Sequence, residues 1–132
     1  MPADYSCTIL SHQSVGNGLY LLTLKATASV FTNQPFTCLP GQFVMIDLPS
    51  DQFLFRRPMS VMSLTTSENE AGQLEIFYRM VGKGTRMMAQ QLHAGDQLTI
   101  LGPLGKGFTL PEDPSKLLLV GGGIGIAPLY FT

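Results

Sequence analysis

The sequence predicts a mainly β fold: a six-stranded antiparallel Greek-key barrel with one short helix, followed by the first strand and helix start of a truncated α/β nucleotide-binding domain. Two observations predict it. Through about residue 110, short segments rich in β-forming residues are separated by turn residues, as in antiparallel barrels and sandwiches. After residue 110, a continuous apolar run leads directly into glycines, as in a parallel strand covered on both faces.

Six segments are expected to form the barrel strands, and several show the alternation of a half-buried strand. In the fifth segment, for example, Leu74 and Ile76 lie on one face, whereas Glu75 and Arg79 lie on the other. The six predicted strands are Ser6–Ser11, Leu19–Ala26, Gln42–Leu48, Met59–Leu64, Leu74–Met80 and Gln97–Leu101.

A hairpin turn and one helix are expected between these strands. Gly16–Gly18 suits a tight turn between the first two strands. Thr85–Leu92 is predicted to be helical, because Met88 and Leu92 lie four residues apart on one side and Gly95 is a suitable stop.

The last part of the chain predicts a second region. Pro111–Ser115 is typical of a linker, and Leu117–Val120 is expected to be the first strand of an α/β sheet. Gly121–Pro128 then has the glycine-rich character of the turn into a nucleotide-binding helix. We expect a barrel domain over residues 1–110 and, over residues 111–132, a linker and the truncated start of the second domain, because a crossover and another parallel strand need more residues.

The composition excludes several classes of protein. With 8 Lys and Arg against 9 Asp and Glu, and no basic cluster, the chain is not expected to bind nucleic acid. It lacks the roughly 20 consecutive apolar residues of a membrane span and has no apparent signal peptide, so a cytoplasmic protein is expected. Cys7 and Cys38 are too few for a metal or iron–sulfur site. The 45% hydrophobic and 13% charged content indicates missing sequence, a cofactor or a partner.

The first segment with recognisable chemistry is Arg56–Ser60, at the start of the fourth predicted strand. The guanidinium of Arg57 offers several donors to a phosphate, and Pro58 biases Arg57 toward an extended conformation. Ser60 lies two residues beyond Pro58 and adds a hydroxyl. Taken alone, the segment could also be a pair of solvated arginines at a strand end.

Two further segments are rich in glycine. In Tyr78–Thr85, glycines allow a ligand to approach the backbone, and the helix that follows offers free N–H groups and a favourable dipole. Gly102–Phe108 is expected to be a tight loop. Alone, the first could be an ordinary helix start, and the second could simply turn the chain out of the barrel.

The order of these segments resembles the ferredoxin–NADP reductase superfamily and, within it, the electron transfer subunit of type B dihydroorotate dehydrogenase. The similarity covers residues 5–129 and rests on Arg57–Ser60, Tyr78–Thr85, Gly102–Phe108 and Leu118–Leu129. It implies an FAD held on the barrel and an NAD(P)-binding domain that begins at Gly121–Pro128.

The resemblance also implies a role for each motif residue. Arg57 would contact the flavin phosphates, Ser60 would lie near N5 of the isoalloxazine ring, and Pro58 and Met59 would line the flavin. Many reductases of the superfamily carry an aromatic residue where Met59 stands, whereas the dihydroorotate dehydrogenase subgroup tends to have an aliphatic one. The second contact segment and the pyrophosphate cradle correspond to Phe77, Tyr78, Arg79, Gly84 and Thr85.

By the same resemblance, the intact protein would pass electrons between a catalytic dehydrogenase subunit, one that contains FMN, and NAD(H). The path would run through FAD and an iron–sulfur (2Fe–2S) centre whose ligands lie beyond Thr132. No catalytic acid or base is expected in this chain, and His12 and His93 are expected to be structural. Two alternatives remain: the FAD subunit of a sulfide dehydrogenase or ferredoxin:NADP oxidoreductase, and a cofactor-free β-barrel that serves as an interaction module.

Overall fold

The computed structural model of the chain describes residues 1–29, 31–49, 55–67 and 70–132. Within these residues, seven strands form one antiparallel sheet in the order β4-β3-β7-β1-β2-β6-β5. Its strands are β1 (Ala3–Gly16), β2 (Leu19–Ala26), β3 (Phe43–Asp47), β4 (Arg57–Ser60), β5 (Ser63–Ser67), β6 (Glu70–Arg79) and β7 (Gln97–Leu104). The helical elements are α1 (Lys83–Gln91), α2 (Ile126–Tyr130) and the short 3-10 turns η1 (Pro114–Lys116) and η2 (Gly123–Gly125).

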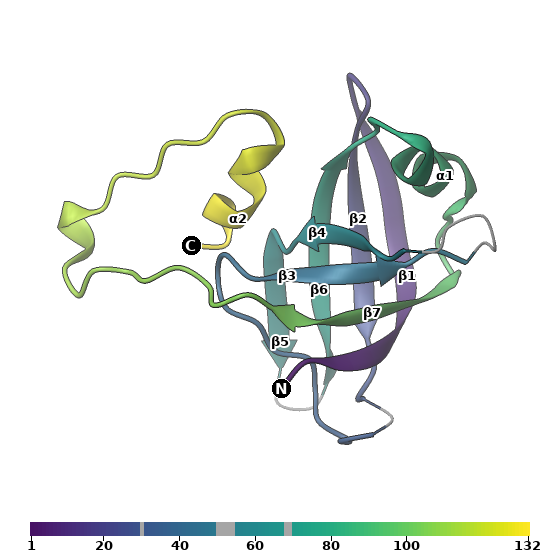
Figure 1. The fold of residues 1–132 in the computed structure, drawn as a ribbon, viewed down its shortest axis with the longest axis horizontal. Helices are drawn as coiled ribbons and strands as arrows, with labels where there is room; N and C mark the ends of the chain where they lie inside the picture. Colours follow the sequence, from purple (N-terminus) through teal and green to yellow (C-terminus); the bar gives the residue numbers. More distant parts are fainter. Residues whose placement is uncertain (30, 50–54, 68–69) are drawn as a thin grey trace.

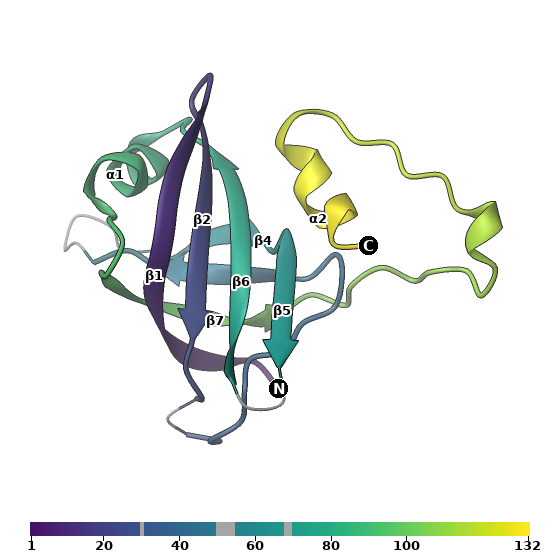
Figure 2. The ribbon, with the colours of Figure 1, turned by 180° about the vertical axis from the view of Figure 1, so that it is seen from behind.

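The sheet curls strongly, so that β3, β4 and β7 cross in front of β1, β2 and β6 (Figure 1). From behind, β1, β2, β6 and β5 stand side by side and form the opposite wall (Figure 2). The inward side chains of both walls form the core, which includes Ile9, Leu22, Leu24, Val44, Ile46, Leu74, Ile76, Met88 and Ile100. The predicted mainly β, barrel-like fold is therefore confirmed.

The strand predicted over Met59–Leu64 is split into β4 and β5 at residues 61 and 62, where the backbone changes partner. The Val61 N–H donates to the Gln42 carbonyl at 3.4 Å, and the Met62 N–H donates to the Glu75 carbonyl at 2.8 Å. The chain thus crosses from β3 to β6, and the two edges of the sheet are joined by consecutive residues. This crossing explains why seven strands are present among the described residues where six were expected.

The predicted hairpin and helix are both present. Asn17 and Gly18 have φ angles of 55° and 72°, and two successive positive values are the signature of the turn that best joins twisted antiparallel strands. The helix α1 begins two residues before the predicted start, and Leu92 is its C-terminal cap. Its Met87 and Met88 are buried in the core.

The predicted loop Gly102–Phe108 is shorter than expected, because β7 continues through Leu104. The side-chain amide of Gln42 makes two hydrogen bonds. Its Nε2 donates to the Gly105 carbonyl at 2.8 Å, and its Oε1 accepts from the Leu39 N–H at 2.8 Å. The Phe108 ring packs on Gly41, where a Cβ would lie 2.8 Å from it. These contacts fix the point at which the chain leaves the barrel.

The segment after β7 runs away from the barrel and returns so that α2 lies beside β5 (Figure 1). The helix start expected after the glycines is present as α2, but Leu117–Val120, expected as a strand, has no strand structure. A strand needs a neighbouring backbone to hydrogen-bond, and none of the described strands pairs with these residues. Leu118 and Val120 are accordingly 83% and 80% exposed.

None of the helices in the described ranges is long and apolar enough to cross a membrane.

Candidate cofactor-binding site

The side chain of Arg57 lies against the first turn of α1. Arg57 is at the start of the edge strand β4, opposite Ile46 of β3. Gly84 is buried under the Arg57 side chain: a Cβ at this glycine would overlap Nε of Arg57 and lie 3.3 Å from its Cδ and Cζ. Two segments that are 27 positions apart in the sequence, and that sequence analysis selected separately, therefore meet in the structure.

The neighbouring Arg56 has a different role. Its guanidinium donates two hydrogen bonds to the Asp4 carboxylate, and Nη2 lies 3.7 Å from Asp47. Arg56 therefore ties the start of β1 to β3, whereas Arg57 faces the helix.

The start of α1 is built around the hydroxyl of Thr85. Its Oγ1 accepts hydrogen bonds from the N–H groups of Val81 and Gly82 at 2.9 and 3.0 Å, and donates to the Gly82 carbonyl at 3.2 Å. The helical ladder begins with the Arg86 N–H, which donates to Gly82 at 2.9 Å. The amides of residues 83–85 precede it and have no acceptor within the helix.

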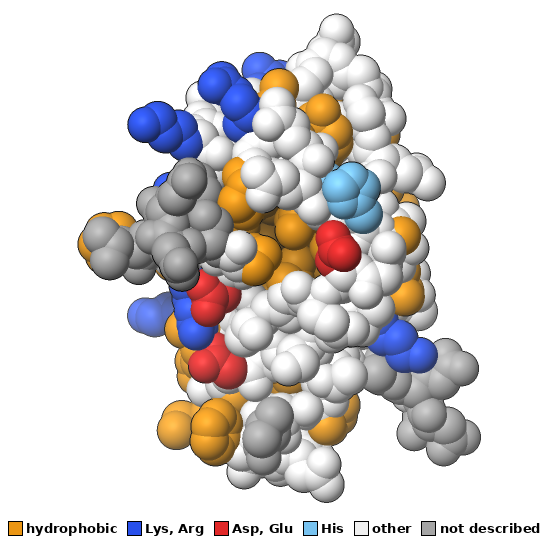
Figure 3. Space-filling model, turned by 90° about the vertical axis from the view of Figure 1, so that its right-hand side faces the viewer, with side chains coloured by type: hydrophobic (Ala, Val, Ile, Leu, Met, Phe, Trp, Pro, Cys, Tyr) orange, Lys and Arg blue, Asp and Glu red, His pale blue; other side chains and the backbone are white. Residues whose placement is uncertain are grey.

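Positive charge surrounds this helix start. Lys83 and Arg86 lie in its first turn and Arg79 ends the preceding strand. On the face shown in Figure 3, Lys and Arg side chains gather at the upper left. Free amides, the helix dipole and several cations together favour a bound anion such as a phosphate.

The other residues of β4 lie on alternate faces. Met59 shares the face of Arg57, is half-buried and packs against the core. Pro58 and Ser60 are exposed on the opposite face, in register with Met45 and Phe43. A proline is accommodated here because β4 is an edge strand.

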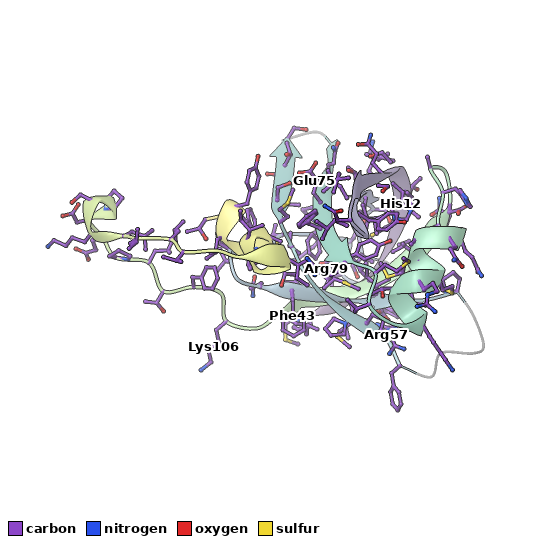
Figure 4. All side chains as sticks on the ribbon, turned by 90° about the horizontal axis from the view of Figure 1, so that it is seen from above. His12, Phe43, Arg57, Glu75, Arg79 and Lys106 are labelled. Carbon is purple, nitrogen blue, oxygen red and sulfur yellow. The ribbon has the colours of Figure 1, made fainter. Side chains whose placement is uncertain are left out.

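On β6, Phe77 and Arg79 point out of the sheet, and Figure 4 shows Arg79 between α2 and α1 in that view. Phe77 lines an apolar cavity of about 230 Å³ between the outer face of the sheet and α2. The other lining residues are Val15, Leu21, Met62, Ile126 and Tyr130. The cavity wall contains no charged side chain among the described residues, so it suits an uncharged, apolar group.

Tyr78 points the opposite way. It is 2% exposed, inside the sheet, and its hydroxyl lies 2.8 Å from Nε2 of His12. Burial, together with the nearby Tyr20, raises the pKa of Tyr78 above its ordinary value. The structure therefore brings Arg57 to Gly84, the residue before Thr85, and places Phe77 and Arg79 on the outer face, but turns the Tyr78 side chain away from them.

Sequence analysis missed the cavity residues Leu21 and Met62 and the contact of His12 with Tyr78. The alternation within β2 places Leu21 outward, but only the split between β4 and β5 brings Met62 beside Phe77. His12 faces inward because a bulge between Ile9 and Ser11 shifts the register of β1, and a bulge has no clear sequence signal here. No group of three or more His, Cys, Asp or Glu within the described ranges is placed to hold a metal ion.

The curled antiparallel sheet places an arginine over the start of α1, and its outer face carries an apolar cavity against α2. Residues 6–108 match the model of the oxidoreductase FAD-binding domain. The chain belongs to this family.

Curated relatives from several bacteria share one protein name among themselves. The chain is 41% identical over 126 residues to the electron transfer subunit of dihydroorotate dehydrogenase B (NAD(+)) from Bacillus caldolyticus, a match that covers 93% of this chain and 46% of the relative. It is 48% identical over 125 residues to the subunit of that name from Enterococcus faecalis, covering 93% and 44%. The chain thus spans about half the length of the curated relatives it matches.

Solved structures show the same fold. The ferredoxin reductase in carbazole 1,9a-dioxygenase superposes with a TM-score of 0.77 at 23% identity, over 98% of this chain and 38% of that one. An NADH-dependent reduced ferredoxin-NADP oxidoreductase, described for flavin-based electron bifurcation, gives a TM-score of 0.72 at 29% identity, over 94% and 41%.

Proposed function

We propose that this chain binds FAD and carries electrons within an oxidoreductase of the dihydroorotate dehydrogenase B type. The observation that carries the proposal is the contact of Arg57 with Gly84 at the start of α1. A dinucleotide has two adjacent phosphates, and this contact combines a guanidinium with helix-start amides. The family match and the names of the curated relatives support FAD as that dinucleotide.

The described residues fit the parts of FAD. Arg57 and the amides of residues 83–85 would hold the phosphates, and the absence of a side chain at Gly84 leaves room for Arg57 to lie close to the helix. The apolar cavity beside Phe77 would receive the apolar benzenoid part of the isoalloxazine ring. Arg79 lies two residues further along the same strand face as Phe77, and its cation would be available to the phosphate side of the cofactor.

Four predicted contacts have narrower roles in this proposal. Met59 offers a flexible, polarizable surface to the ring. Pro58 holds the backbone of Arg57 extended, and Ser60 provides the hydroxyl predicted to lie near N5. Thr85 would act on the phosphates through the amides that it caps, because its hydroxyl is engaged with Val81 and Gly82.

Bound FAD would supply the redox chemistry, and the protein would supply position and electrostatics. We assign residues 1–110 to an FAD-binding domain and residues 111–132 to a linker and the start of an NAD(P)-binding domain. The electron donor would be an FMN-containing dehydrogenase subunit. NAD and a 2Fe–2S centre would complete the path in the intact protein, in line with the resemblance to such electron transfer subunits.

A second candidate is the FAD subunit of a ferredoxin:NADP oxidoreductase, which the 29% identity to an NADH-dependent enzyme of that type favours. The two candidates differ in their electron donor. Reduction of the bound flavin by a dihydroorotate-oxidising subunit favours the first, and reduction by reduced ferredoxin favours the second.

Titration of the purified 132-residue chain with FAD tests the proposal. We expect a yellow complex with a flavin spectrum. Arg57→Ala should weaken FAD affinity roughly 10- to 150-fold, because a charge-assisted hydrogen bond to phosphate is lost. Arg56→Ala is the matched control, since Arg56 pairs with Asp4 and should leave the affinity nearly unchanged. A chain that takes up no FAD would contradict the proposal, and equal affinity in wild type and Arg57→Ala would contradict the assignment of Arg57.

A further inference from the structure

His12, on the inner face of the curled sheet, contacts both elements of the candidate site, the helix α1 and the strand β6. Nδ1 of His12 lies 2.8 Å from the carbonyl of Leu92, the C-terminal cap of α1. Nε2 of the same ring lies 2.8 Å from the hydroxyl of Tyr78 in β6. The helix whose start faces Arg57 and the strand that carries Phe77 and Arg79 are therefore bound to one imidazole.

The partners determine the tautomer of the neutral ring. A carbonyl oxygen only accepts hydrogen bonds, so Nδ1 of His12 must carry the hydrogen and donate to Leu92. Nε2 then accepts from the Tyr78 hydroxyl. A tyrosine hydroxyl is protonated at neutral pH and can donate, and burial raises the pKa of Tyr78 further.

The surrounding rings hold the imidazole in place. His12 stacks on Tyr78 with ring centroids 5.9 Å apart, and Tyr20 lies 5.5 Å from each of them. A bulge in β1 turns His12 into the sheet, opposite Leu22. The imidazole of His12 is therefore held in one place. If α1 moved relative to β6, the ring could not keep both of its hydrogen bonds.

We propose, on the basis of the FAD site proposed above, that His12 is a positioning residue for the bound dinucleotide. It fixes the distance between the helix that holds the phosphates and the strand whose outer face holds the ring. The core contacts of α1 come from apolar Met87, Met88 and Leu92, which anchor the helix by packing, a contribution that is not directional. The two hydrogen bonds of His12 are directional and set the position of the helix along the strand.

A ligand that spans both parts is sensitive to their separation, whereas a ligand that touches one part is not. ADP contains the phosphates of FAD but lacks the isoalloxazine ring. We expect His12→Leu to weaken FAD affinity about tenfold through loss of both hydrogen bonds. The inhibition constant of ADP against FAD should stay within about twofold, because the helix start itself is unaltered.

Rescue and control variants accompany this measurement. His12→Asn keeps a donor near the position of Nδ1 and should recover part of the FAD affinity. Tyr78→Phe removes the other hydrogen bond and should reproduce part of the loss, and it decides the question if His12→Leu does not fold. His93→Leu is the matched control, because the His93 side chain is 74% exposed.

The outcomes separate this inference from the proposed function. If wild-type chain binds no FAD, the proposed function fails and the positioning role fails with it. If wild type binds FAD and the His12 and Tyr78 variants bind it equally well, only the positioning role is overturned. An equal loss of FAD and ADP affinity would also overturn it, because His12 would then support the helix start alone.

Discussion

At the scale of single residues, the contact between Arg57 and Gly84 gives the sharpest test of the site. Alanine at position 84 would place a Cβ on Nε of Arg57, and the flexible arginine would have to move away from the helix start. Alanine is otherwise favoured over glycine in a helix by up to about 1 kcal/mol. We therefore expect Gly84→Ala to maintain or raise stability while it weakens FAD affinity, measured by titration.

Gly82 provides the control for this substitution. It lies two residues before Gly84, has an extended φ of −149°, and a Cβ added to it would have no other atom within 4 Å. Gly82→Ala should therefore leave the FAD affinity close to wild type, and it should lower the urea midpoint slightly, because Gly82 is the N-cap of α1 and alanine is a poorer N-cap than glycine. If Gly82→Ala and Gly84→Ala changed the FAD affinity equally, the contact between Arg57 and Gly84 would have no specific role in binding the cofactor.

Residue by residue, part of the site follows from the alternation of strands alone. The period of two places Phe77 and Arg79 on one face of β6 and Tyr78 on the other, and the structure agrees. The resemblance groups all three as contacts, which is a statement about the backbone segment rather than about each side chain. The contact of Arg57 with Gly84 depends on how the sheet curls, and no local pattern indicates it.

At the scale of elements, the stability of α1 depends on its first turn. The Thr85 hydroxyl accepts hydrogen bonds from the N–H groups of Val81 and Gly82, in place of backbone carbonyls. Thr85→Val keeps the shape but loses both hydrogen bonds, and should lower the free energy of unfolding by about 1 kcal/mol. Thr85→Ser keeps the hydroxyl and should lose much less. Urea unfolding of the three proteins measures the difference, and a Val variant as stable as the Ser variant would contradict the capping role.

Elements that depend on local pattern were predicted well, and elements that depend on distant partners were not. The six segments predicted as strands all contain strand structure, because each has its own alternation or turn signals. The split at residues 61 and 62 could not be predicted, because it depends on distant hydrogen-bond partners. The N–H of Val61 bonds to Gln42, and the N–H of the next residue bonds to Glu75. Leu117–Val120 has the composition of a buried strand, but composition supplies no neighbouring strand.

At the scale of the whole molecule, both faces of the curled sheet contribute to the candidate site. The interior of the sheet buries the core and the hydrogen bonds of His12, and its exterior carries the cavity beside Phe77. The crossing between β4 and β5 places Arg57 and Met62 on one short stretch of chain, near the helix start and the cavity respectively. The curl of the sheet thus assembles the site as well as the core.

Burial of ionisable groups in the core also makes stability depend on pH. Burial raises the pKa of Cys7 from 9.0 to about 12 and that of Cys38 to about 11, and it raises the pKa of Tyr78 as well. All three groups are neutral when protonated, so at neutral pH they cost nothing in either state. Above about pH 9 the unfolded chain loses protons that the folded chain retains.

We therefore expect the free energy of unfolding to be nearly constant from pH 7 to about pH 8.5 and to fall as the pH rises further. The fully buried Cys7 alone contributes a slope of at most about 1.4 kcal/mol per pH unit, between the pKa of the unfolded thiol and that of the folded one. Urea unfolding at several pH values measures this slope. Cys7→Ala should be less stable at pH 7 because it leaves a cavity, but its stability should fall less steeply above pH 9. An equally steep decline in wild type and variant would mean that ionisation of Cys7 is not coupled to unfolding.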